Sequence, residues 1–493
     1  MDSNYEKPYK VNAVPSVREL FFGFTRSGYK FRDALAEYID NSFQQALKAS
    51  DPSKVRIEVS YGSNGPIYYL EITDNAGGAK IEDAVNFIRP GASGNDSTSE
   101  SFGLFGIGGK IAGLSVVKEA VIVKSRAIGE KGFQITLDKK EIETKSDWMF
   151  DVIPLQTDSN VEEGTTTVIL HGIPSEEALN LKNTTLADYR KRYAYLLTSN
   201  DGKVPKIFLD GKEVVPRDPR EDMLSSEEAP KNCEPTHYID SKEIRSVQQD
   251  NDLHLDKLEF EAIVGVRPES STIGESGAAI YCNNRLIETN SQIAINPSFN
   301  NEEESRIHPA SDKAWVNAVV NVKGPANLMP WTSRKDGLDP SVESYHLLEK
   351  FLAAAYNDFL SNHIGKAREE LRSNLDYGHK KVSVSDILID SYVRKLKGGD
   401  LHTETVRPRV KTSHSFIRAI GKTKSVGKTE PPEETNVITL QARVERDKVE
   451  KVKRLIATET GSVIIKNTEL IRYLIEYILK YSSEAIGNEG ELE

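Results

Sequence analysis

The N-terminal part of the chain, to about residue 180, shows two hydrophobic periods. From residue 31 to 48, small and apolar residues recur at three- and four-residue spacing, which predicts an amphipathic helix. Apolar and polar residues alternate in five other segments, which predicts strands: 54–60, 67–73, 116–125, 132–137 and 165–171. These strands come in runs without crossover helices between them, so we expect an α+β layer with largely antiparallel pairing.

A second α/β region follows and ends near residue 361. Its strand-like segments are 206–214, 260–266, 278–282 and 318–322, and Asp210-Gly211 predicts a tight turn in the first of them. Helical patterns cover 341–359 and then 366–396. We therefore expect five parts: two α/β domains (1–185 and 186–361), a helical segment (362–404), a linker (405–435) and a small C-terminal module (436–482).

A chain of 493 residues is too long for a single hydrophobic core, which agrees with several domains. Hydrophobic residues make up 38% and charged residues 28%, so the chain is globular rather than disordered. The formal charge of −11 argues against non-specific coating of DNA, although it averages over local patches. The linker is one such patch, because residues 405–429 carry seven basic side chains and no acidic one: Arg407, Arg409, Lys411, Arg418, Lys422, Lys424 and Lys428.

The two cysteines, Cys233 and Cys282, offer no disulfide framework, which favours a reducing compartment. No apolar run approaches the ~20 residues of a membrane span, and the first residues lack the apolar core of a signal peptide. We therefore expect a cytoplasmic protein, or a nuclear one in a eukaryote, without membrane association. Association with a nucleoid is left open.

A carboxylate and a carboxamide stand four residues apart on the helix predicted at 31–48. Glu37 and Asn41 would leave the same face of that helix. A carboxylate can take a proton from water, and an amide oxygen is a hard ligand for Mg²⁺. The pair fits a hydrolytic Mg²⁺–nucleotide site, although the pair alone is more typical of a solvated helix face.

Three more motifs suit a nucleotide. Asp74-Asn75-Ala76-Gly77-Gly78 follows a strand, where a carboxylate can accept from an exocyclic amine and glycines let the backbone approach a flat base. A simple turn explains it equally well. Four glycines, at 103, 106, 108 and 109, precede Lys110 and an apolar helical run, which makes a cradle of backbone amides for an anion. Finally, Thr165, Thr166 and Thr167 could turn hydroxyls to a base pocket, or form an ordinary threonine-rich strand.

Together and in this order, the four motifs closely resemble the nucleotide-binding boxes of the GHKL ATPases. That superfamily includes gyrase B subunits, the large heat-shock chaperones, MutL, type IIB topoisomerases and the microrchidia (MORC) proteins. The resemblance implies a Bergerat-fold α/β sandwich over residues 1–185 that binds ATP and Mg²⁺ and hydrolyses ATP. It implies that Glu37 is the general base, Asn41 the Mg²⁺ ligand, and Asp74 the acceptor for the adenine amine, with Gly78 beside the base. It also implies that the phosphates meet the glycine box, with an ATP lid over 86–102; the box residues are Gly103, Gly106, Gly108, Gly109 and Lys110.

The sequence departs from the family pattern at three places. Ala76 stands where the pattern has its first glycine, and Gln44 stands where an acid usually follows the asparagine. The run of three threonines leaves open which hydroxyl meets the base pocket. We favour Thr166, with Thr165 next.

A lysine in the second region offers a further cation. Lys335 ends the run Pro330-Trp-Thr332-Ser-Arg334-Lys335, and a lysine from another domain can stabilise charge on a γ-phosphate. A basic surface turn is the simpler alternative. The Pro-x-Thr-x-x-Lys pattern resembles the lysine loop of MORC transducer (S5-like) domains, and residues 281–287, YCNNRLI, resemble a strand of the same domains. The resemblance covers about residues 12–360 and implies a catalytic Lys335, for which Arg334 could substitute.

The C-terminal module has a β-α-α pattern, with clean alternation over residues 437–444. About 45 residues form a weak core alone, and a single strand needs a partner that dimerisation supplies. The module resembles a ribbon-helix-helix domain, in which paired strands enter the DNA major groove. Thr439, Gln441 and Arg443 would then face base edges. A plain dimerisation cap is the alternative.

The complete set of motifs is most similar to a prokaryotic MORC protein. That resemblance implies a homodimeric clamp whose N-terminal domains associate with ATP and whose C-terminal modules pair. It would hydrolyse ATP and act on DNA, in trapping, compaction, defence or silencing. The alternative is a chaperone-type clamp on protein clients, because GLFGIGG is at least as close to the chaperone pattern. We do not expect a sensor kinase, since no histidine precedes the helix that carries Glu37.

Overall fold

The computed structural model describes residues 16–25, 28–89, 108–156, 161–199, 203–247, 253–268, 276–295, 310–375 and 382–397. The chain divides into two compact units, Met1–Thr405 and Val406–Glu493. All described residues belong to the first unit. The basic linker and the C-terminal module, with Thr439, Gln441 and Arg443, lie outside the described residues. So does the expected lid from residue 90 onward, together with Gly103 and Gly106.

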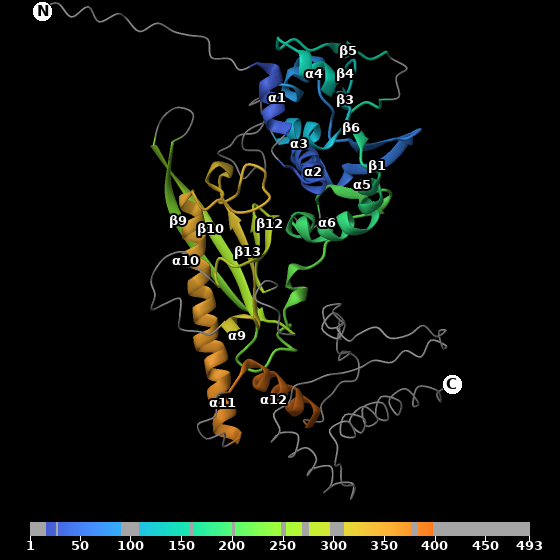
Figure 1. Cartoon of the computed structure of the whole chain (residues 1–493). Coiled ribbons are helices and arrows are strands. Elements are labelled where there is room, and N and C mark those ends of the chain that lie inside the picture. The colour runs from blue at the N-terminus through green and yellow to red at the C-terminus, as the bar shows by residue number, and fades with distance from the viewer. Residues whose placement is uncertain are drawn as a thin grey trace, which may run out of the picture. The chain divides into compact units, whose positions relative to one another are not determined.

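The first sheet has eight strands in the order β5-β4-β3-β6-β2-β1-β7-β8 (Figure 1). The strands are β1 (Arg56–Asn64), β2 (Ile67–Asp74), β3 (Ala120–Arg126), β4 (Phe133–Asp138), β5 (Val152–Pro154), β6 (Thr165–Ile173), β7 (Lys206–Leu209) and β8 (Lys212–Glu213). All neighbours pair in antiparallel fashion except β1 and β7. The five strands expected from alternation are therefore present, and the expected antiparallel pairing is confirmed.

One strand lies in a different sheet from the one expected. The segment at Lys206–Leu209, assigned from the sequence to the second α/β region, pairs in parallel with β1 and extends the first sheet. Alternation shows which side chains share a face, but it does not name the partner strand. The tight turn is confirmed, because Asp210 and Gly211 have φ values of 48° and 74° and join β7 to β8.

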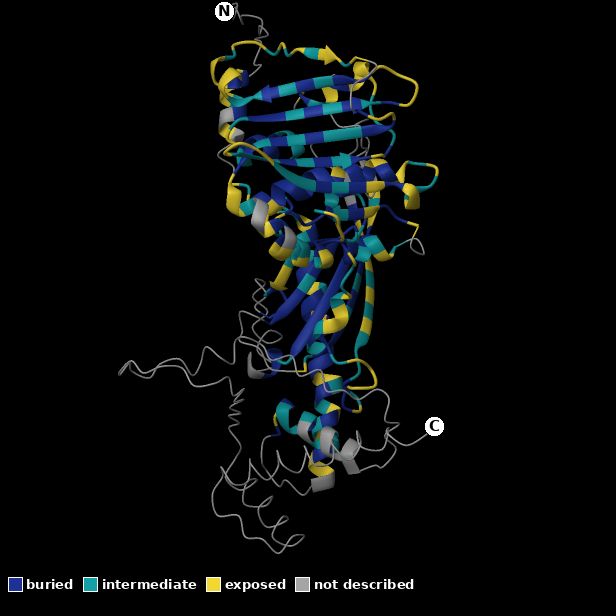
Figure 2. Cartoon of the chain, turned by 90° about the vertical axis from the view of Figure 1, so that its right-hand side faces the viewer, coloured by how far each residue is buried: buried dark blue, intermediate teal, exposed yellow. Residues whose placement is uncertain are grey.

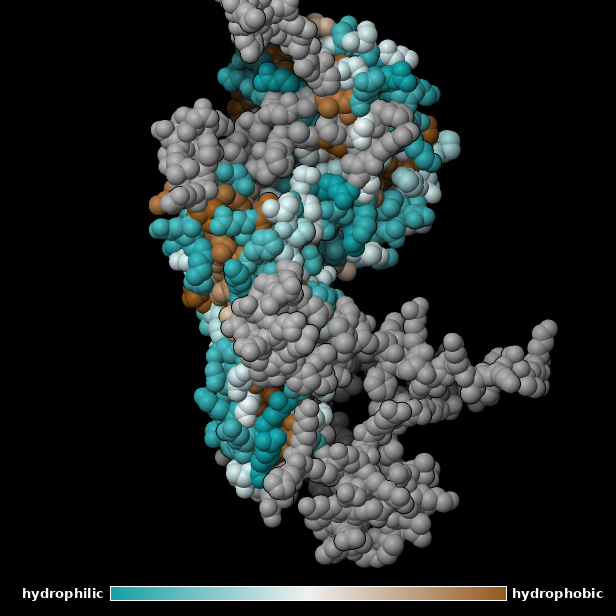
Figure 3. All heavy atoms as spheres, turned by 60° about the vertical axis from the view of Figure 1, so that its left-hand side comes forward, coloured by the Kyte–Doolittle hydropathy of each residue, from teal (hydrophilic) through white to brown (hydrophobic). Residues whose placement is uncertain are grey.

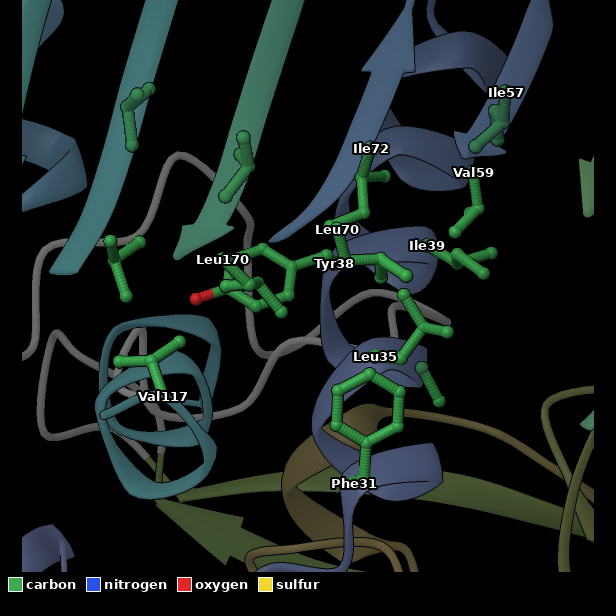
Figure 4. Close-up of a cluster of buried hydrophobic side chains, with 14 of the residues drawn as sticks. Phe31, Leu35, Tyr38, Ile39, Ile57, Val59, Leu70, Ile72, Val117 and Leu170 are labelled. Atoms are coloured by element: carbon green, nitrogen blue, oxygen red, sulfur yellow. The ribbon is translucent and has the colours of Figure 1, made fainter. Parts of the chain in front are cut away.

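Helices cover one face of this sheet. The long helix α2 (Phe31–Leu47) packs beside α3 (Gly108–Val116), and α1 (Val17–Thr25) lies next to α3. Figure 4 shows Leu35 and Ile39 of α2 gathered with Leu70 and Ile72 of β2, and all four are at most 2% exposed. Each such burial contributes about 1.5–3 kcal/mol. This packing fixes the helix that carries Glu37 and Asn41.

Short helical elements complete the first part of the chain: η1 (Pro52–Lys54), η2 (Ile81–Phe87), α4 (Lys139–Thr144), α5 (Ser175–Asn180), η3 (Leu181–Thr185), α6 (Leu186–Arg192) and α7 (Ala194–Thr198). Two tyrosines tie α6 to α2. The hydroxyl of Tyr189 donates to the carbonyl of Arg32 at 2.7 Å, and that of Tyr193 donates to Oδ1 of Asp40 at 3.0 Å. The segment leading to the second sheet is therefore anchored on the helix of the candidate site.

The second sheet has five strands in the order β12-β11-β13-β10-β9. They are β9 (Thr236–Val247), β10 (Leu253–Val266), β11 (Gly277–Cys282), β12 (Arg285–Ser291) and β13 (Val316–Lys323). Only β11 and β13 run parallel among these pairs. Three of these strands were expected, whereas β9 and β12 were not, because long polar runs interrupt their alternation.

Helix α10 (Glu343–Asp358) packs along β10, and α11 (Gly365–Leu375) and α12 (Val384–Lys397) follow it (Figure 1). They match the helical patterns expected at 341–359 and 366–396. Among the described residues of this part, four short elements remain: η5 (Pro219–Asp222), α9 (Ala310–Lys313), η6 (Ala326–Leu328) and η7 (Phe359–Ile364). Among the described helices, none is both long and apolar enough to cross a membrane.

Burial follows the two sheets. Figure 2 shows buried residues along the central strands of both, with exposed residues in turns, on outer helix faces and along edge strands such as β9. In Figure 3, hydrophobic residues are interspersed among hydrophilic ones on the described surface. Scattered apolar residues of this kind are normal for a globular protein.

Candidate nucleotide site

Glu37 and Asn41 meet the first turn of α3. A Cβ added to Gly108 would collide with Oε2 of Glu37, and one added to Gly109 would lie 3.0 Å from Nδ2 of Asn41. The two side chains therefore leave the same face of α2, toward the start of the glycine-led helix. Glu37 is 3% exposed, while Asn41 is exposed. Only glycines allow α3 to approach this closely.

The N-terminus of α3 supplies an anion-binding element. Its first backbone N–H groups have no partner within the helix, and the helix dipole favours negative charge there. Tyr38 fixes the turn, because its hydroxyl donates to the carbonyl of Gly109 at 2.6 Å. Lys110 lies on the same turn, and its ammonium donates to the backbone carbonyl of Arg89 at 2.8 Å. Burial, and then the charge of Arg89, lower the pKa of Lys110 to about 8.

Asp74 lies buried at the end of β2. Its Oδ2 accepts from the hydroxyl of Ser42 at 2.6 Å, and its Oδ1 accepts from the backbone N–H of Ala76 at 3.1 Å. Burial raises its pKa, which the bond from Ser42 partly offsets. A carboxylate accepts through about four lone-pair positions, so Asp74 retains capacity for a further donor such as an exocyclic amine.

The glycines after Asp74 have distinct roles. Gly77 and Gly78 have φ values of 113° and 65°, and a Cβ on Gly78 would collide with the carbonyl of Arg126. Gly77 donates to the carbonyl of Gly164 at 2.9 Å, which joins this motif to the start of β6. Ala76 is not among the residues with positive φ, and its buried methyl packs with Ala46 and Val55. An alanine therefore fits at this position without strain.

The three threonines are separated by the pleat of β6. Thr166 pairs across the sheet with Asp74, so both lie on the helix-covered face. Its hydroxyl is 2.9 Å from that of Ser125. Thr165 lies on the opposite face, where its hydroxyl donates to the carbonyl of Glu162 at 2.7 Å. Of the two threonines expected near the base, only Thr166 shares a face with Asp74.

Lys335 reaches from the second part of the chain into this site. Its Nζ is 3.0 Å from both carboxylate oxygens of Glu37 and 3.3 Å from Oδ2 of Asp40. Lys335 is 6% exposed. Its neighbour Arg334 instead pairs with Asp336 at 3.1 Å and remains partly exposed. The structure therefore distinguishes the two cations of this loop, and only Lys335 meets Glu37.

The lysine loop is a compact turn. The backbone N–H of Lys335 donates to the carbonyl of Thr332 at 2.9 Å, and the hydroxyl of Thr332 donates to Oδ1 of Asp336 at 2.7 Å. Trp331, 4% exposed, forms a bridge with Leu338. The threonine of the Pro-x-Thr-x-x-Lys pattern thus shapes the turn that presents the lysine.

Two charged residues of the site had no role in the sequence analysis. Asp40 follows Glu37 by three positions on α2, and Arg285 opens β12. Arg285 is fully buried, and its Nε lies 2.7 Å from Oδ2 of Asp40. That contact lacks the alignment of a hydrogen bond, so the attraction is chiefly between opposite charges. In the sequence, Arg285 stands within the run YCNNRLI, which indicated a strand but gave no role to the arginine itself.

Glu37, Asp40, Arg285 and Lys335 form a buried group of charges, and this group and its burial shift the pKa of Glu37. Burial raises the pKa of its carboxyl, the charge of Lys335 lowers it, and the charge of Asp40 raises it further. The net direction is upward. A base with a raised pKa accepts a proton more readily than an exposed glutamate does.

The residues present fit Mg²⁺ only if it is shared with phosphates. Among the described residues, no group of three His, Cys, Asp or Glu side chains could hold a metal. The side chain of Asn41 is exposed, with its amide nitrogen nearest to Gly109, so its amide oxygen could serve as a ligand. Phosphate oxygens and water would complete the coordination that Mg²⁺ prefers.

Comparison with known families agrees with this geometry. Residues 29–168 match the family model described as "Histidine kinase-, DNA gyrase B-, and HSP90-like ATPase". The match covers less than a third of the chain but includes α2, the Asp74 motif, α3 and the start of β6. It identifies this segment as a GHKL-type ATPase domain, which supports an ATP-driven activity. No curated protein matches the chain.

Proposed function

We propose that the chain is a Mg²⁺- and ATP-dependent dimerising clamp of the MORC type that hydrolyses ATP and acts on DNA. The observation that carries this proposal is the contact between Lys335, from beyond the ATPase segment, and Glu37 within it. A lysine so placed links the ATP site to the second sheet. It would let the nucleotide control the arrangement of the two parts.

The resting contact suggests how ATP starts the reaction. The ammonium of Lys335 holds both oxygens of Glu37, so the carboxylate is engaged by a cation instead of by water. A γ-phosphate at the start of α3 carries more negative charge and competes for the same lysine. Once Lys335 turns to the phosphate, Glu37 is free to take a proton from the attacking water. The lysine then stabilises charge on the transferred group.

Different residues would bind the two ends of ATP, the adenine base and the phosphates. Asp74 would accept from the adenine amine, with Gly78 and Thr166 beside the base. The first turn of α3, with Gly108, Gly109 and the more distant Lys110, would face the phosphates. A bound Mg²⁺ neutralises phosphate charge, and Asn41 would hold it.

Asp74→Asn should weaken ATP binding about 10- to 100-fold, because a hydrogen bond to a charged group contributes about 1.5–3 kcal/mol. The amide can also present a donor to the adenine amine. Titration calorimetry with a non-hydrolysable ATP analogue measures the effect. Asp51→Asn, at a surface aspartate that caps a short helix, is the matched control and should bind normally. Unchanged affinity in Asp74→Asn would remove Asp74 from the adenine site.

Action on DNA is proposed from sequence features beyond the described residues. The basic linker carries seven cations, and the C-terminal module resembles a ribbon-helix-helix domain. Each cation that meets a phosphate releases counterions, and paired strands would add base contacts from Thr439, Gln441 and Arg443. Tethering to a clamp raises the local concentration of DNA even when each contact is weak.

Duplex DNA should therefore increase the rate of ATP hydrolysis by the full chain. Glutamine in place of the seven basic residues of 405–429 should abolish this increase and leave the basal rate intact. The plot of log affinity against log salt should lose up to about six units of slope, since each phosphate contact contributes about 0.9. A steady-state ATPase assay with and without duplex measures the stimulation, and fluorescence anisotropy with labelled duplex at several salt concentrations measures the slope.

The outcomes separate the candidate substrates. Stimulation by duplex DNA that depends on the linker supports the proposal. Stimulation by an unfolded protein and none by DNA would instead favour a chaperone-type clamp. Equal DNA affinity of the natural and substituted chains would place the DNA site elsewhere.

A further inference from the structure

We propose that Arg285 is a positioning residue for Lys335, and that it sets the place of the lysine relative to Glu37 by bridging Asp40 and the lysine loop. The inference rests on the role proposed above for Lys335 in ATP hydrolysis. It adds a fully buried residue that would act through Lys335. It also names the route by which the second sheet acts on the site.

The start of β12 is rigidly placed. Arg285 follows a turn in which Asn283 and Asn284 have φ values of 48° and 68°. The side chain of Asn283 bonds both the N–H and the carbonyl of Gly324, at 3.1 and 2.9 Å. The side chain of Asn284 accepts from Nδ2 of Asn321 on β13. These bonds hold the turn against the neighbouring strand, so the backbone of Arg285 has a fixed position in the second sheet.

The guanidinium of Arg285 contacts both helix α2 and the lysine loop. Its Nε is 2.7 Å from Oδ2 of Asp40 on α2, and its Nη1 donates to the backbone carbonyl of Lys335 at 3.1 Å. Oδ2 of Asp40 in turn lies 3.3 Å from Nζ of Lys335. Arginine is suited to this bridge, because its planar fork presents several donors in fixed directions.

The lysine loop requires such a restraint. Lys335 has a φ of 53°, in the left-handed region that non-glycine residues adopt only when their surroundings impose it. Two hydrogen bonds hold its backbone: one from its own N–H to Thr332, and one from Arg285 to its carbonyl. Without Arg285 the carbonyl of Lys335 loses this partner, so we expect the left-handed residue to relax and the ammonium to leave Glu37.

Arg285→Lys isolates the positioning role. A lysine keeps the positive charge opposite Asp40, but its single ammonium cannot hold Asp40 and the carbonyl of Lys335 in the fork geometry. The matched control is Arg368→Lys, since Arg368 is also a largely buried arginine of the second part, paired with Asp312 at 2.8 Å. Neither Arg368 nor Asp312 belongs to the candidate site. Thermal melting of both variants checks the fold.

The first measurement is the acylation of Lys335 by acetic anhydride in the full chain without nucleotide, followed by mass spectrometry. Lys335 should be protected in the natural chain and in Arg368→Lys. In Arg285→Lys it should approach the reactivity of Lys54, whose side chain is 83% exposed. Continued protection in a folded Arg285→Lys chain would overturn the proposal. This readout needs no hydrolysis, so it stands apart from the proposed ATPase function.

The second measurement is steady-state ATP hydrolysis. Arg285→Lys should lower kcat with little change in KM, because adenine and phosphate contacts remain. Added to Lys335→Met, it should cause no further loss, since Arg285 acts through the lysine. Losses that multiply in the double variant would show an independent structural role and contradict the inference. If Arg285→Lys and Lys335→Met both hydrolyse ATP at the rate of the natural chain, the proposed function fails, whatever the labelling of Lys335 shows.

Discussion

Glu37→Gln is expected to stop ATP turnover while the chain still binds ATP. The substitution keeps the shape of the side chain beside Gly108 but removes the carboxylate that we propose accepts a proton from water. A general base contributes about 10²- to 10⁴-fold to a rate, so kcat should fall by that factor. Asp74, proposed to contact adenine, and the amides of α3 are unchanged, so the affinity for a non-hydrolysable analogue should stay close to normal.

Two controls make this test specific. Glu58→Gln removes an exposed carboxylate of β1 that pairs with Arg56, and it should leave both turnover and binding unchanged. Thermal melting checks the fold, because Glu37→Gln leaves Lys335 with Asp40 as its remaining anionic partner. Near-normal hydrolysis by a folded Glu37→Gln chain would show that another group acts as the base.

The first sheet could be predicted largely from local pattern. Alternation located five strands and the helical period located α2, because their apolar positions face one continuous core. The same patterns could not place β7, whose partner β1 lies far away in sequence. They also missed β9 and β12, because the polar runs DSKE in β9 and ETNS in β12 interrupt the alternation. Pairing is a property of the whole fold and leaves little trace in a short segment.

The candidate site was predicted unevenly for a similar reason. Motifs identified Glu37, Asn41, Asp74 and Lys335, since each stands in a run of recognisable residue types. Asp40 and Arg285 carried no separate signal, because their significance arises from a contact between α2 and the second sheet. Buried charges of this kind are stable only as a set, and the set is assembled by the tertiary fold.

Lys335→Met is expected to lower kcat/KM by about 10²-fold or more, because removal of one preorganised group that stabilises developing charge has an effect of that size. The methionine fills a similar volume without a charge. Arg334→Met is the matched control on the same loop, and it should have little effect because Arg334 pairs with Asp336 at the surface. The opposite ranking would assign the cationic role to Arg334.

The pH dependence of the same variant tests the resting contact directly. The charge of Lys335 lowers the pKa of Glu37, so its removal should raise that pKa further above the usual value. Glu37 must be ionised to act as a base, and a higher pKa leaves more of it protonated at a given pH. The acid limb of the profile of kcat/KM, which reports groups of the free enzyme, should therefore move to higher pH in Lys335→Met. Arg334→Met should keep the natural profile. An acid limb that stays in place in Lys335→Met would show that the lysine and Glu37 are not in contact before ATP binds, and the competition between Glu37 and the γ-phosphate for this lysine would have to be abandoned.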